Sequence, residues 1–205
     1  MTTHDSATTA HDSAAAIPES TIAESVVPGA GTAGDAFPDG DTGPRQEGFQ
    51  SRLPDLTTLY PDLAVLSGSV HKAVRNGPVP QSTVTLMLLR AAQIVGSTYH
   101  CIRITDGLRK AGEEERRITA IATWQDAPYF SGAERIALEL AEAVLTPNPF
   151  GERVSDDLFA RASRHYNDEE IWHLTIALGH LGMFIPVALI AKPIPGRPPG
   201  KNYSK

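Results

Sequence analysis

Apolar residues recur at intervals of three and four along most of the chain, and this spacing is the feature that most limits its fold. In "PDLAVLSGSVHKAVRNG" the residues Leu63, Leu66, Val70 and Val74 follow it, as expected for one face of a helix. Alternation of apolar and polar residues, which is typical of a strand, is nearly absent from Leu53 onward. The sequence therefore predicts an all-α bundle of six to eight helices.

Residues that start and stop helices divide this part of the chain. We expect a strongly apolar helix over about 81–95, then a break at Gly96-Ser97. The next helix ends at Gly112, after two basic residues that suit a helix C-terminus. Three later helices have predicted start signals: Ser131 with Glu134, Ser155, and Asn167 with Glu170.

Charge and composition separate a tail from the body of the chain. Residues 1–50 hold eight acidic side chains and one basic one, which leaves 16 acidic and 17 basic for residues 51–205. The tail is rich in Ala, Ser, Thr and Gly, and we predict that it is disordered because it has too little apolar surface to bury. Residues 51–195 are the predicted helical domain, and residues 196–205 form a Pro/Gly-rich C-terminal tail. A nearly neutral body gives no reason to expect nucleic acid as a partner.

The sequence also gives an expectation for the cellular location of the protein. It has no basic segment followed by an apolar one at its start, so we expect no secretory signal. The apolar run after Trp172 is interrupted by Gly179, His180, Gly182 and Pro186, and we therefore expect no membrane span and no membrane partner. A single cysteine suits a reducing compartment, so the predicted location is cytoplasmic.

The segment "STYHCIRITDGLRKAG" carries that one cysteine, Cys101, directly after His100. Helical spacing puts Thr98, Cys101 and Thr105 on one stripe, with Tyr99 and His100 beside it or opposite. A neighbouring imidazolium or a helix N-terminus activates a thiol by lowering its pKa. Free cysteine is also among the most often buried side chains. Spacing alone leaves both a reactive thiol and an inert core cysteine open.

Longer stretches carry a resemblance to a known family. "LRAAQIVG" (89–96), the helix end "RKAG" (109–112) and "WQDAPYFS" (124–131) resemble the alkylhydroperoxidase D / carboxymuconolactone decarboxylase family. The resemblance covers residues 53–195 and implies an all-α fold that assembles as a homo-oligomer, a trimer or a hexamer.

Redox members of that family carry a Cys-x-x-Cys-x-x-x-His motif and a glutamate one helix earlier. The resemblance places the first cysteine on Thr98, the second on Cys101, the histidine on Thr105 and the glutamate most nearly on Thr85. Dithiol chemistry needs a second thiol to resolve the oxidised one, and the chain has none. A self-sufficient dithiol peroxidase is thereby excluded, whereas a peroxidase that pairs Cys101 with an external thiol stays open.

The decarboxylase side of the family implies proton-transfer chemistry on a small-molecule substrate without a metal or an organic cofactor. Histidine suits such chemistry because it titrates near neutrality. His100 and His180 lie in otherwise apolar helices, and we predict that they are the catalytic acid and base. The predicted catalytic set is His100, His180 and Cys101, and the predicted substrate-binding set is Thr98, Tyr99, Thr105, Trp124 and Phe184.

Apolar residues in the last helix, Phe184 among them, stand where the family usually has polar ones, which indicates an apolar or aromatic substrate. The reaction class is then decarboxylation, isomerisation or elimination. His71, His165 and His173 follow polar helix faces and are given no role, and no set of residues has convincing metal-ligand spacing. A catalytically inactive oligomeric binding protein is the remaining alternative.

Overall fold

The computed structural model describes residues 51–195, and this part of the chain is entirely helical. The helices are α2 (Leu56–Leu59), α3 (Pro61–Arg75), α4 (Gln81–Ile94), α5 (Thr98–Lys110), α6 (Glu115–Ala120), the 3-10 helix η1 (Ile121–Thr123), α7 (Gly132–Leu145), α8 (Asp156–Ala162) and α9 (Asp168–Ala191). The predicted all-α class is confirmed. The predicted tails, residues 1–50 and 196–205, lie outside the described residues.

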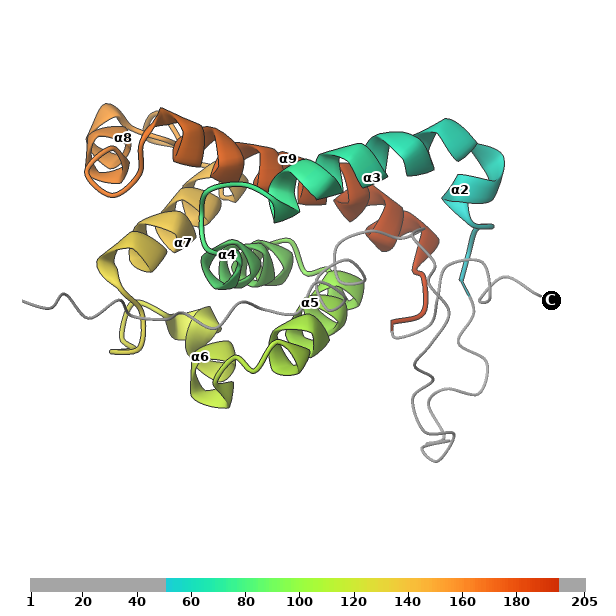
Figure 1. Ribbon diagram of the computed structural model, residues 1–205, viewed down its shortest axis with the longest axis horizontal. Coiled ribbons are helices and arrows are strands. Elements are labelled where there is room, and N and C mark those ends of the chain that lie inside the picture. Colours follow the sequence, from blue (N-terminus) through green and yellow to red (C-terminus); the bar gives the residue numbers. More distant parts are fainter. Residues whose placement is uncertain (1–50, 196–205) are drawn as a thin grey trace, which may run out of the picture.

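Helix α4 is the centre of the bundle, and Figure 1 shows it end-on with α5, α7 and α9 around it. It is buried on nearly all sides, because its residues from Thr83 to Leu89 and both Ala91 and Ala92 are inaccessible to solvent. A helix that is apolar all round is stable only when neighbours cover every face. The packing of α4 against α5, α7 and α9 meets that condition.

Local signals in the sequence set the helix ends. Gly96 (φ +67°) and Gly112 (φ +80°) lie in the left-handed region before and after α5, where a side chain would be strained. The predicted capping boxes of α7 and α9 are confirmed, and the Ser155 hydroxyl accepts from the Leu158 N–H at the start of α8. These ends fix where each helix places its polar residues.

The residues that interrupt the apolar run after Trp172 do not end the helix. Helix α9 continues without a break through Gly179, His180, Gly182 and Pro186. Proline removes one backbone donor, and the contacts of α9 with α3 and α4 hold the helix despite that loss. Among the described residues α9 is the helix that is long and apolar enough to cross a membrane, by length and composition alone.

The buried face of α3 overlaps the one that its apolar spacing predicts, but it is turned toward Ser67 and His71. Ser67, His71 and Val74 are its buried residues, whereas half of Leu66 is exposed. The reason is α9, which lies beside α3 (Figure 1) and presents polar groups to it. Polar residues of α3 therefore face the interior, and an apolar one faces outward.

Candidate active site

His100 lies in the first turn of α5 and is 1% exposed. Its Nδ1 is 2.8 Å from the hydroxyl of Ser97, the N-cap residue, which is itself buried. The ring of Tyr99 meets the imidazole edge-on, with centroids 5.4 Å apart. The other nitrogen, Nε2, is buried and has no hydrogen-bond partner among residues 51–195. Ser97 and Tyr99 thus fix the position of the imidazole, and its Nε2 is the ring nitrogen without a partner in the described residues.

The protonation state of His100 follows from its surroundings. Burial lowers its pKa to about 4, and the positive charge of Arg103 adds to the effect. Desolvation disfavours the charged form of a base, as does a like charge nearby. The imidazole is therefore neutral at physiological pH.

Thr98, Cys101 and Thr105, which lie on one stripe of α5, are more exposed to solvent than His100. Thr98 is exposed, and Cys101 and Thr105 are half-buried. Cys101 packs against the hydrophobic core, and burial raises the pKa of its thiol. The cysteine is protonated at neutral pH, which makes it a poor nucleophile.

His180 is the centre of a second polar group, between α3 and α9. Its Nε2 is 3.2 Å from the Ser67 hydroxyl, and its ring lies 6.3 Å from that of His71 and 5.6 Å from that of Phe184. All four residues are buried. Nδ1 of His180 and both nitrogens of His71 have no hydrogen-bond partner within the described part of the chain.

Both imidazoles of this group are biased toward the neutral form. Burial, and then the neighbouring His71, lower the pKa of His180 to about 4. Burial and the charge of Arg75 lower the pKa of His71. Expecting His71 on a polar outer face was wrong. Its spacing from Ser67 and Val74, four and three residues, was the signal that could have placed it on the buried face.

Trp124 belongs to a third group. Its indole N–H donates to Glu142 Oε1 at 2.8 Å, and the same oxygen accepts from Arg90 Nε at 2.7 Å. Arg135 lies over the indole ring, 5.9 Å from its centroid. The tryptophan and the ion pair join α4 to α7. His100, His180 and Trp124 therefore have different neighbours: those of His100 lie in α5 and its N-cap, those of His180 in α3 and α9, and those of Trp124 in α4 and α7.

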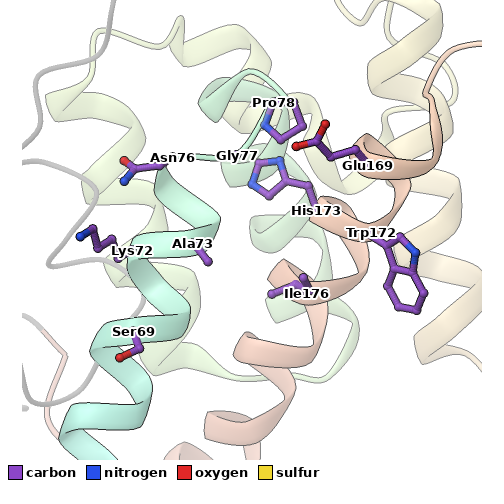
Figure 2. A pocket seen from close by; sticks show the side chains of 10 residues that line it. All are labelled: Ser69, Lys72, Ala73, Asn76, Gly77, Pro78, Glu169, Trp172, His173 and Ile176. Atoms are coloured by element: carbon purple, nitrogen blue, oxygen red, sulfur yellow. The ribbon is translucent and has the colours of Figure 1, made fainter.

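A groove of about 490 Å³ lies between α3 and the first half of α9 (Figure 2). Its walls include Lys72, Ala73 and Asn76 from α3, and Glu169, Trp172 and Ile176 from α9. None of the eight site residues predicted from the sequence lines it.

His173 also lines this groove and is buried, contrary to the expectation of a polar outer face. Its Nδ1 accepts from the Val79 N–H at 3.1 Å, and its Nε2 is 2.6 Å from the Val74 carbonyl. Since Nδ1 accepts a hydrogen bond from the Val79 amide, Nε2 carries the ring proton and donates a hydrogen bond to the Val74 carbonyl. Both nitrogens are satisfied, so this histidine ties α9 to the α3–α4 connection.

The region that carries His71, His100 and Cys101 matches a known family. Residues 63–143 fit the sequence profile of the carboxymuconolactone decarboxylase family. This central part of the chain is thus similar to that family, and the fold is of the alkylhydroperoxidase D type.

Two uncharacterised bacterial proteins are similar to the chain over part of its length. Uncharacterised protein YdfG of Bacillus subtilis (strain 168) is 27% identical over 132 residues, which are 64% of this chain and 88% of YdfG. Uncharacterised protein YnjA of Escherichia coli (strain K12) is 30% identical over 107 residues, 51% of this chain and 56% of YnjA.

Two solved structures have the same fold. One is a protein of unknown function from Agrobacterium tumefaciens, described as a candidate antioxidant defence protein AhpD, with a TM-score of 0.64 and 23% identity. The match covers 73% of this chain and 99% of that one. The other is the debrominase Bmp8, with a TM-score of 0.61 and 18% identity over 68% of this chain and 74% of Bmp8.

Proposed function

We propose that the chain is a cofactor-independent enzyme that moves protons on an apolar or aromatic small molecule, by decarboxylation, isomerisation or elimination. The observation that carries the proposal is the pair of free buried nitrogens, His100 Nε2 and His180 Nδ1. Leaving a buried polar group without a partner costs free energy, so such groups in folded proteins need a reason. A substrate that bonds to these nitrogens supplies it.

The charges around the imidazoles favour an acidic substrate. Arg103 lowers the pKa of His100, and Arg75 lowers that of His71 beside His180. The positive charges near the two imidazoles therefore favour a negatively charged group on the substrate, such as a carboxylate or a developing enolate. A bound anion raises the imidazole pKa toward neutrality, where general acid–base catalysis is most effective. Edge contacts from Tyr99 and Phe184 suit an aromatic ring.

Two observations weigh against the alternatives. The raised pKa of Cys101 disfavours a peroxidase that attacks through a thiolate. A binding protein that had lost its active site would be expected to fill it with apolar side chains, yet three imidazoles are buried with free nitrogens. Bmp8 is a debrominase whose cysteine-to-alanine variant was solved with 2,3,4-tribromopyrrole, so this fold accommodates an aromatic ligand in that protein.

The test is deuterium exchange into a panel of β-keto acids, lactone acids and hydroxybenzoates in D₂O, followed by proton NMR together with CO₂ release. His100→Asn keeps an amide near Nδ1 for Ser97 and removes Nε2, and His180→Gln keeps an amide near Nε2 for Ser67 and removes Nδ1. We expect each variant to lower the exchange rate by roughly 10²–10⁴-fold.

His165→Gln is the matched control, since His165 is exposed, and it should keep the wild-type rate. Cys101→Ala separates the thiol alternative, because a thiol-dependent enzyme loses all turnover in this variant. Wild-type exchange that survives in both the His100→Asn and His180→Gln variants would contradict the assignment.

A further inference from the structure

One face of α3 carries polar side chains into the protein. Ser67, His71 and Arg75 follow one another at intervals of four residues, so they form a stripe along the helix. Ser67 is 1% exposed and His71 is 8% exposed, while Arg75 is half-buried and its Nε is inaccessible to solvent. These three side chains are here named the α3 polar stripe. It lies against α9, where His180 meets Ser67.

The stripe and His180 have buried polar atoms without partners. They are both ring nitrogens of His71, Nδ1 of His180 and Nε of Arg75, none of which has a hydrogen-bond partner within residues 51–195. The two imidazole rings are neighbours, with centroids 6.3 Å apart, yet they do not bond to each other. Because each unpaired buried group costs free energy, four of them on two adjacent helices indicate a site whose ligand supplies the missing partners.

The charge of Arg75 indicates the kind of ligand. Arg75 forms no ion pair with any residue that the structure describes. Its positive charge adds to burial in lowering the pKa of His71, so its field reaches the imidazole. The same field repels a metal cation and attracts an anion. In the described part of the chain, moreover, no three His, Cys, Asp or Glu side chains are grouped so that they could hold a metal ion.

We propose that His180 and the α3 polar stripe bind the carboxylate of the substrate, a role that rests on the proposed function and that makes the substrate a carboxylic acid. In this arrangement the Ser67 hydroxyl donates to Nε2 of His180, 3.2 Å away. The ring proton of His180 is then on Nδ1. Nδ1, one nitrogen of His71 and the guanidinium of Arg75 donate to the carboxylate. His71 and Arg75 are thus substrate-binding residues in addition to the predicted set.

The spacing of the groups suits a carboxylate. An oxygen that accepts from a ring nitrogen lies about 4 Å from the centroid of that ring. Two rings with centroids 6.3 Å apart therefore leave room for one oxygen that accepts from both. The second oxygen is left for Arg75, one turn further along α3 than His71. A guanidinium suits it because it presents several N–H donors to a carboxylate.

The test is an NMR titration of the full-length chain at pH 7 and constant ionic strength. The probes are acetate and benzoate, with the neutral acetamide and benzamide as their counterparts. We expect the two carboxylates, but not the amides, to cause saturable shifts in the ring signals of His71 and His180. The signal of His165, which is exposed, should not move.

Two substitutions of Arg75 test its part in binding. Arg75→Gln should weaken carboxylate binding at least about tenfold, because a hydrogen bond from a charged donor is lost. Arg75→Lys keeps the charge and should retain part of the affinity. Lys72→Gln is the matched control, since it removes one positive charge from the same helix at an exposed position. The control should bind like the wild type, and circular dichroism should be the same for all three variants.

Several results would overturn the proposal. A wild-type chain that binds neither carboxylate would do so, as would equal affinities of the wild type and Arg75→Gln. Loss of binding in Lys72→Gln but not in Arg75→Gln would move the anion to the outer side of α3. Shifts of the two ring signals with zinc chloride and not with a carboxylate would make the cluster a metal site.

Failure of the carboxylate site is distinguishable from failure of the proposed function. If the acids exchange deuterium and Arg75→Gln leaves their KM unchanged, the enzyme stands and the site is wrong. If acetate and benzoate bind through Arg75 while no acid of the panel exchanges, the site stands and the acid–base function is wrong.

Discussion

His173 holds the α3–α4 connection with both ring nitrogens, and the chain leaves room for it by placing glycine at position 77. A Cβ on Gly77 would lie 2.4 Å from His173 Nε2. The side chain that fixes this connection and the residue that makes space for it are therefore energetically coupled.

Gly77→Ala should lower the free energy of unfolding by about 2 kcal/mol because the ring must move. His173→Ala should lower it by about 3 kcal/mol, since the Val79 N–H and the Val74 carbonyl lose their partner. In the double variant the loss should be smaller than the sum, measured by urea denaturation. Gly68→Ala, where the added methyl meets nothing, should cost nothing. Additive losses would show that the two residues are not coupled.

Sequence patterns located some histidines at the residue scale and missed others. His180 lies in an apolar helix, and its burial could be predicted from its neighbours along the chain. The burial of His173 and the packing of His71 beside His180 could not be predicted in this way, because both depend on contacts about 100 residues away along the chain. Ser67 meets His180 and the Val74 carbonyl meets His173 across that distance, and a local pattern of apolar residues contains no such information.

At the scale of single elements, capping residues determine where the helices begin. Ser131 with Glu134 and Asn167 with Glu170 form complete capping boxes. Both boxes could be predicted from the sequence because each needs only four consecutive residues. The packing of α9 against α3 and α4 could not be predicted in this way, since it joins residues that are far apart along the chain.

Asn167→Ala should lower the free energy of unfolding by about 1 kcal/mol, because the Glu170 N–H loses its acceptor at the start of α9. Asn167→Ser retains an oxygen at the cap and should restore most of that loss. Thermal or urea denaturation of the two variants measures the difference. Equal losses in the alanine and serine variants would mean that the cap does not stabilise α9.

At the scale of the whole molecule, the fold class and the resemblance to the carboxymuconolactone decarboxylase family could be predicted from the sequence, but the grouping of the site residues could not. The resemblance joins His100, His180 and Trp124 in one predicted site, whereas in the structure each of the three side chains contacts a different set of residues. Which helices meet depends on long-range packing around α4, and chain order does not encode it directly. The buried imidazoles of α5 and α9 are the candidates for acid–base chemistry.

Burial of these imidazoles makes the stability of the whole domain depend on pH. The pKa of His100 is about 4 in the folded chain and about 6.5 when unfolded. Between those values the unfolded chain binds more protons, so stability is lost as pH falls through this window. The His100 contribution is about 3 kcal/mol at most, and His180 changes in the same direction. His100→Asn should flatten the dependence of unfolding free energy on pH between about 6.5 and 4.

The most direct test of the central claim is an NMR titration of the seven histidines of the full chain, assigned with single His→Gln variants. The claim is that His100 and His180 are buried, neutral imidazoles with a free nitrogen each. Their ring signals should titrate with midpoints near 4 and stay in the neutral form at pH 6. Midpoints near 6.5 for both rings would show that they are solvated, and would contradict the account.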